Sequence, residues 1–126
     1  MTDETLTQVL PEHKGLAFII TKSYKKDMSA EALYEATRGV WKDVPEHDAS
    51  FLYAFATCKG IVKEVYEIEQ WEKAGTKPYT MVSHADTNLT NRWEFVGHVA
   101  PESVRSLYIG KKIVRSYGSP FKKVGG

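Results

Sequence analysis

The chain has 126 residues, a formal net charge of +1 and 26% charged residues, as expected for one globular domain. Its single cysteine excludes an intrachain disulfide, and no apolar run approaches the roughly 20 residues of a membrane-spanning helix. Residues 1–14 are acidic and polar, unlike a secretory signal, so we expect a flexible leader before one domain at 15–126. We expect a cytoplasmic protein with no membrane partner.

The first part of the domain predicts a strand, a helix and a loop. Residues 15–24 form an apolar, β-branched run of strand length. A helix follows, with Ser29 as its N-cap and Gly39 in the left-handed conformation after its last turn. The next residues, up to position 50, contain Pro45 and predict a loop.

The clearest signal in the sequence is a β-hairpin. Two apolar runs, at 51–58 and 61–68, flank the pair Lys59-Gly60, which predicts a tight turn. Both runs carry apolar side chains on both faces of the expected strands. We therefore expect the sheet to be covered on both sides.

The rest of the chain predicts a long polar loop at 69–91, a strand at 92–99, a short helix at 101–109 and a final strand near 121–124. Pro101 is expected at the first position of that helix and Gly110 just after its end. Because regular β–α–β alternation is missing, a doubly wound parallel sheet is not expected. The prediction is an α+β fold: a small, mostly antiparallel sheet or an open β-barrel, with two short helices.

Catalytic and metal sites have little support in the sequence. The four histidines do not have metal-ligand spacing and Cys58 has no partner cysteine, so we predict no metal, no cofactor and no catalytic residue. One enzymatic alternative is kept open. It is a small nuclease or hydrolase that would use Glu64, Glu67 and a histidine such as His98.

Aromatic and basic residues point to nucleic acid. Aromatic rings stack on bases for about 1–3 kcal/mol each, and lysine and arginine bind phosphate. Residues 101–126 hold six basic side chains against one acidic side chain, which favours an anionic partner. We predict a nucleic-acid site made of Arg38, Trp41, Lys59, Trp71, Arg92, Trp93, Lys111 and Lys112.

Arg38 and Trp41 have two competing interpretations, because both lie where the expected helix meets the following loop. In the first, Arg38 contacts a phosphate or a base edge and Trp41 stacks on a base. In the second, Arg38 pairs with the last-turn carbonyl oxygens and a nearby glutamate, while Trp41 fills the end of a barrel. The sequence alone leaves both open.

Four stretches resemble a poorly characterised family of small bacterial and phage domains, some of which accompany GIY-YIG endonucleases. They are Thr-Arg-Gly-x-Trp at 37–41, Gly-Ile-Val-x-Glu-Val-Tyr at 60–66, Arg-Trp-x-Phe at 92–95 and Tyr-x-Gly-Lys at 108–111. The family more often ends in a Gly-x-Asn-Pro-like stretch, whose asparagine is missing from the Gly-Ser-Pro-Phe at 118–121. Any role of that turn is therefore in question here.

The hairpin and the Arg-Trp strand also resemble the PUA-like superfamily, which includes the ASCH, EVE and YTH groups. Those small barrels bind RNA or modified bases in an aromatic-lined pocket. The resemblances imply a PUA-like domain at 15–126 that binds DNA or RNA, including a modified or flipped base, and that acts with a partner nuclease. A small-molecule or protein-interaction accessory domain is the main alternative, and the oligomeric state is not indicated.

Overall fold

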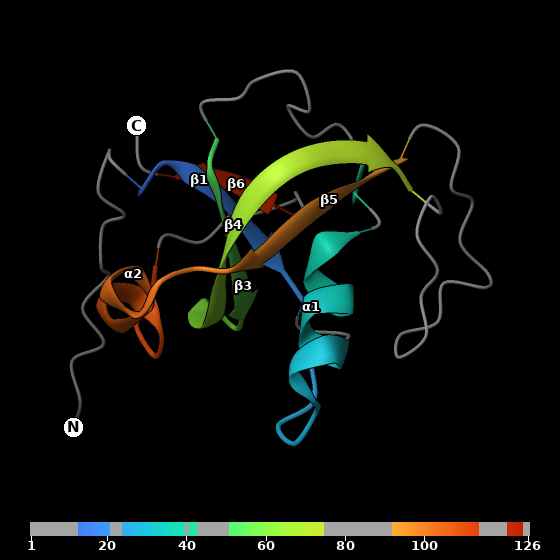
Figure 1. Ribbon diagram of the computed structural model, residues 1–126. Helices are drawn as coiled ribbons and strands as arrows, with labels where there is room; N and C mark the ends of the chain where they lie inside the picture. Colours follow the sequence, from blue (N-terminus) through green and yellow to red (C-terminus); the bar gives the residue numbers. More distant parts are fainter. Residues whose placement is uncertain are drawn as a thin grey trace, which may run out of the picture.

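The computed structural model describes residues 13–20, 24–39, 41–42, 51–74, 92–113 and 121–124. These residues form six strands and two helices, shown in Figure 1. The helices are α1 (Ala30–Arg38) and α2 (Glu102–Tyr108). The strands are β1 (Gly15–Ile19), β2 (Trp41–Lys42), β3 (Tyr53–Cys58), β4 (Ile61–Lys73), β5 (Arg92–Val99) and β6 (Phe121–Val124).

The strands form one open, mixed sheet in the order β2-β5-β4-β3-β1-β6. Strands β1 and β3 are parallel, and the other four pairings are antiparallel. Within the described ranges the edge strands β2 and β6 do not pair with each other, so the sheet does not close into a barrel. The predicted α+β class with a mostly antiparallel sheet and two short helices is therefore confirmed, in its open form.

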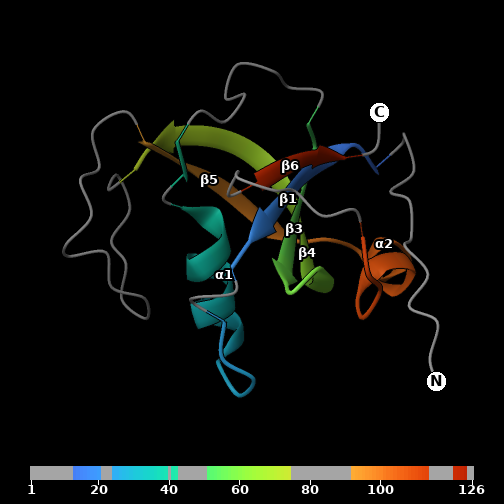
Figure 2. The same ribbon diagram turned by 180° about the vertical axis from the view of Figure 1, so that it is seen from behind.

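Side chains from alternate positions of the strands build a core on each face of the sheet, because successive strand residues point to opposite sides. The face toward α1 carries Leu16, Phe18, Ile20, Ala54 and Ala56. The face toward α2 carries Ala17, Phe55, Val62 and Val65, which pack with Tyr108 of α2. Figures 1 and 2 show the two helices on opposite sides of the β3–β4 hairpin, which confirms the expected cover on both faces.

The β3–β4 hairpin turns at Lys59-Gly60, as predicted. Both residues have positive φ, 54° and 84°, which is the geometry of a tight turn whose twist matches the flanking strands. The chain after α2 lies beside this turn. The amide of Val62 donates to the carbonyl of Lys111 at 3.0 Å, and the amide of Ile113 donates to the carbonyl of Gly60 at 3.0 Å.

Helix α1 begins as predicted, because the Ser29 side chain accepts a hydrogen bond from the amide of Ala32. Its end differs from the prediction. Gly39 has an extended backbone, with φ −163°, and not a left-handed one. The reason is that the chain runs on directly into β2, which pairs Trp41 with Trp93 of β5.

Two further expectations are corrected. Residues 69–73, predicted as part of a polar loop, continue β4, because β5 supplies hydrogen-bonding partners that outweigh the low strand propensity of this polar stretch. Pro101 is the N-cap of α2, and the helix starts one residue later, at Glu102. The expected leader up to residue 12, the loop around Pro45 and the remainder of the polar loop at 75–91 lie outside the described residues.

Two other features bear on the expected organisation. His13, assigned to the leader, is described, and its Nδ1 lies 2.7 Å from the hydroxyl of Tyr108 in α2. Neither α1 nor α2 is long and apolar enough to cross a membrane; this holds for the described part of the chain.

The left-handed backbone at Lys59 yields a stability prediction. A lysine at φ 54° is strained, whereas asparagine adopts this conformation readily. We expect Lys59→Asn to raise the free energy of unfolding by about 0.5–1 kcal/mol. Urea denaturation measures the change, with Lys25→Asn at an exposed site as control. A loss of stability in Lys59→Asn would show that the lysine side chain stabilises the turn.

Candidate functional site

The structure divides the eight predicted nucleic-acid-binding residues into two groups at opposite ends of β4. Five of them lie around the end of α1 and the far end of β4, which finishes at Lys73; these are Arg38, Trp41, Trp71, Arg92 and Trp93. The other three lie at the β3–β4 turn, where β4 begins; these are Lys59, Lys111 and Lys112. The indoles and the C-terminal lysines therefore do not share one surface.

The tryptophans of the first group pack in or against the core. Trp41 is 8% exposed, its ring stacks on Phe18 with centroids 4.6 Å apart, and its indole N–H donates to the carbonyl of Thr37 at 2.7 Å. Trp71 and Trp93 are half-buried and pack against the same core. At Trp41 both the ring and the indole N–H are thus engaged within the protein.

Arg38 is buried and forms an ion pair with a buried glutamate. Its Nη1 lies 3.1 Å from Oε2 of Glu94, and the two side chains are 5% and 0% exposed. The guanidinium carbon lies 6.0 Å from the centroid of the Tyr34 ring, on the same helix. This is the second interpretation of Arg38, pairing with a nearby glutamate, and Glu94 on β5 is that partner.

A tyrosine on α1 adds a second link between the helix and β5. The Tyr34 hydroxyl accepts a hydrogen bond from the amide of Gly97 at 3.0 Å. Burial raises the pKa of Tyr34, and the coulombic effect of Arg38 opposes that rise. Together with the Arg38–Glu94 pair, this contact fixes the orientation of α1 on the sheet.

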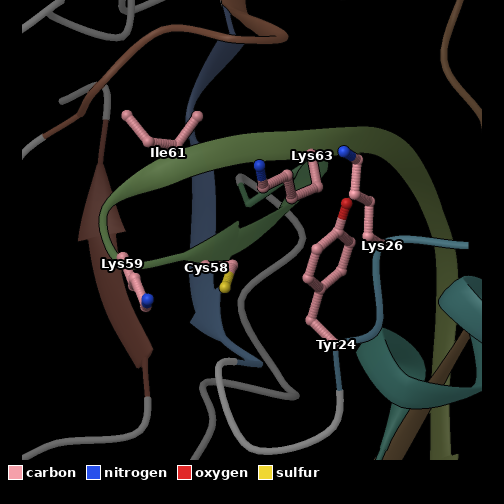
Figure 3. A pocket seen from close by; sticks show the side chains of 6 residues that line it. All are labelled: Tyr24, Lys26, Cys58, Lys59, Ile61 and Lys63. Carbon is pink, nitrogen blue, oxygen red and sulfur yellow. The ribbon is translucent and has the colours of Figure 1, made fainter.

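One residue of the second group, Lys59, lines a cationic hollow of about 600 Å³ beside the β3–β4 turn. We call it the lysine hollow. Figure 3 shows its six lining residues, which are Tyr24, Lys26, Cys58, Lys59, Ile61 and Lys63. Three of the six are lysines and none is acidic, so the hollow has the electrostatic character of an anion site.

The hollow is assembled because β1 and β3 run in parallel. Ile19 pairs with Thr57, so the residues that follow the two strands emerge at the same end of the sheet. The amide of Tyr24 donates to the carbonyl of Ile20 at 2.8 Å, which anchors the turn that carries Lys26. Nζ of Lys63 lies 5.1 Å from the centroid of the Tyr24 ring, a cation–π contact across the hollow.

Of the residues that line the hollow, Lys59 was predicted from the sequence, whereas Lys26, Lys63 and Tyr24 were not. The available signal was Tyr-Lys-Lys at 24–26, directly after the first strand, together with a lysine close behind the hairpin turn. These signals become a site only if the first strand is known to pair in parallel with the third. A hairpin prediction alone does not contain that long-range pairing.

The residues of the enzymatic alternative are only partly brought together. His98 and Glu67 are cross-strand partners, and Nε2 of His98 lies 2.6 Å from Oε1 of Glu67. Nδ1 of His98 lies 3.0 Å from Oε2 of Glu69. Glu64 is engaged elsewhere, because both of its carboxylate oxygens bind the guanidinium of Arg105, at 2.7 and 3.1 Å.

The Glu67–His98–Glu69 cluster lies on an exposed part of the sheet, where the His98 side chain is 55% exposed. Two hydrogen bonds raise the pKa of His98 above its usual value. The bond to Glu69 has the larger effect, and the bond to Glu67 has the smaller one. Among the described residues, no group of histidine, cysteine and acidic side chains is arranged to hold a metal ion. The cluster can exchange a proton and stabilise the pairing of β4 with β5.

Comparison with family models, with curated proteins and with solved structures finds no match to this chain. The fold and its surface define the protein as a small α+β domain with an open mixed sheet and a lysine hollow beside the β3–β4 turn.

The raised pKa of His98 predicts how stability depends on pH. The folded state binds the proton more tightly, so the contribution of the cluster is complete below the unfolded pKa of about 6.5. It is lost as the pH rises through the higher folded pKa. We expect the stability advantage of the wild type over His98→Gln to shrink as the pH rises from about 6 to about 9 in urea denaturation. An advantage that grows with pH would contradict this assignment.

Proposed function

We propose that this protein is a nucleic-acid-binding module that contacts phosphates through the lysine hollow. The observation that carries the proposal is the convergence of Lys26, Lys59 and Lys63 from two separate parts of the chain on one recess without an acidic lining residue. The electrostatic attraction of lysines to phosphates supplies most non-specific nucleic-acid binding.

Two of the predicted nucleic-acid-binding residues, Lys111 and Lys112, follow α2 and lie near the hollow. Lys111 is exposed. The backbone of Lys112 forms an isolated antiparallel β-bridge with Ile61, which lines the hollow. A nucleic-acid strand that enters the hollow would therefore pass close to further positive charge. Positive charge around a recess also accelerates the encounter with an anionic partner.

The strained backbone of Lys59 is a second line of support. Asparagine, aspartate and glycine are the residues favoured at positive φ in such turns, yet a lysine is present at φ 54°. Strained residues that persist in folded proteins often serve function. Contact with phosphate explains why a lysine occupies this position, whereas turn formation alone does not.

The aromatic part of the predicted site is revised in this proposal. Trp41 is buried in the core, and Trp71 and Trp93, like Tyr24, are partly buried against it. Base contacts are assigned to Tyr24 because it is the aromatic residue that lines the hollow. A modified or flipped base would then rest against one tyrosine and not between indole rings. The PUA-like resemblance, the cytoplasmic location and a partner nuclease belong to the proposal on the strength of the sequence alone.

A small-molecule accessory domain is the second candidate function. The volume of the hollow, about 600 Å³, falls in the range of ligand pockets. Its lysine lining restricts such a ligand to an anion. Binding of a small anion without binding of oligonucleotides would favour this candidate.

A salt titration tests the proposed function. We expect short DNA or RNA oligonucleotides to bind with an affinity that falls steeply from about 50 to about 200 mM salt, as counterion release requires. The double variant Lys26→Gln/Lys63→Gln should lose about tenfold or more in affinity and reduce the salt slope by about 1–2, since two phosphate contacts are removed. Fluorescence anisotropy measures both quantities.

The matched control is Lys25→Gln/Lys73→Gln, which removes the same charge from two exposed lysines that are not among the lining residues. It should retain most of the affinity and the salt slope. Absence of oligonucleotide binding at low salt, or an equal loss in both double variants, would contradict the proposed function.

A further inference from the structure

The formal charge of the lysines that line the hollow is larger than the charge of an internal phosphate of a nucleic-acid chain. Three lysines line the hollow, whereas a phosphodiester carries a single negative charge. A phosphate monoester carries about −1.5 to −2 at neutral pH and offers three strong acceptor oxygens. Each lysine ammonium is a donor without any acceptor, so the three lysines suit those three oxygens.

The placement of the lysines also favours the terminal phosphate of a nucleic-acid strand over an internal phosphate. Lys26 comes from the turn after β1, Lys59 from the hairpin turn and Lys63 from β4, and Figure 3 shows them around the recess and not in a row. A row of lysines would follow successive phosphates of a continuous strand. A recess with cationic groups on several sides suits a phosphate that is linked to the nucleic-acid strand through one oxygen only.

The uncharged residues of the hollow provide a surface for the nucleoside next to such a phosphate. Tyr24 presents an aromatic ring and Ile61 an aliphatic side chain beside the lysines. Aromatic side chains bind bases of any sequence by stacking. The turn that carries Tyr24 is held by two hydrogen bonds. The amide of Tyr24 donates to the carbonyl of Ile20 at 2.8 Å, and the amide of Met28 donates to the carbonyl of Lys25 at 3.0 Å.

We propose that the lysine hollow receives the terminal phosphate of a nucleic-acid strand, with the terminal nucleoside against Tyr24 and Ile61. The inference rests on the proposed function and narrows it to one class of ligand, a strand with a phosphorylated end. Binding of this kind distinguishes a cut or processed strand from the interior of an intact one.

The experiment compares oligonucleotides of one sequence with a 5′-phosphate, with a 3′-phosphate and with two hydroxyl ends, as single strands and as duplexes. A fourth ligand, two residues longer with hydroxyl ends, adds the same charge as internal phosphodiesters. At about 150 mM salt, we expect one phosphorylated ligand to bind at least about tenfold more tightly than both hydroxyl-ended ligands. The Lys26→Gln/Lys63→Gln variant should reduce this ratio to about one, and Lys25→Gln should keep it.

The outcomes separate this inference from the proposed function. If all four ligands bind with a salt slope but the end groups differ by less than about twofold, the inference fails and the proposed function stands. The inference also fails if Lys26→Gln/Lys63→Gln keeps the full ratio. If no oligonucleotide binds, the proposed function fails as well, and binding of a nucleoside monophosphate alone would then assign the hollow to a small anion.

Discussion

The buried ion pair between Arg38 and Glu94 determines which parts of this protein are available to a ligand. Both side chains are almost fully removed from solvent, so separating them would move two opposite charges apart in an environment of low dielectric constant. Breaking such a pair by removing one partner costs about 3–5 kcal/mol. The last turn of α1 is therefore fixed on β5.

The position of Trp41 follows from this constraint. Three residues after Arg38, the chain enters β2, and the indole lies on Phe18 with its N–H bound to Thr37. A side chain held in this way would have to leave the core before it could stack on a base. The aromatic residues near α1 thus act as the core of the domain, and the cationic hollow at the other end of β4 is left as the candidate binding surface.

The extent of agreement between sequence and structure has a physical explanation. The hairpin turn at Lys59-Gly60 and the Ser29 cap were predictable because neighbouring residues determine them. The role of Arg38 was not, since its partner lies far along the chain and either of two environments suits an arginine. The hollow was missed for the same reason: it needs the parallel pairing of β1 with β3, which no local pattern indicates.

The most direct test of this account is a double-mutant cycle on Arg38 and Glu94, followed by oligonucleotide binding. Arg38→Leu or Glu94→Leu alone should lower the free energy of unfolding by about 3–5 kcal/mol, and the double variant should lose much less than the sum. The double variant should bind oligonucleotides within about twofold of the wild type, because the lysine hollow is unchanged. A folded double variant that no longer binds would place the site at the end of α1 and contradict the account.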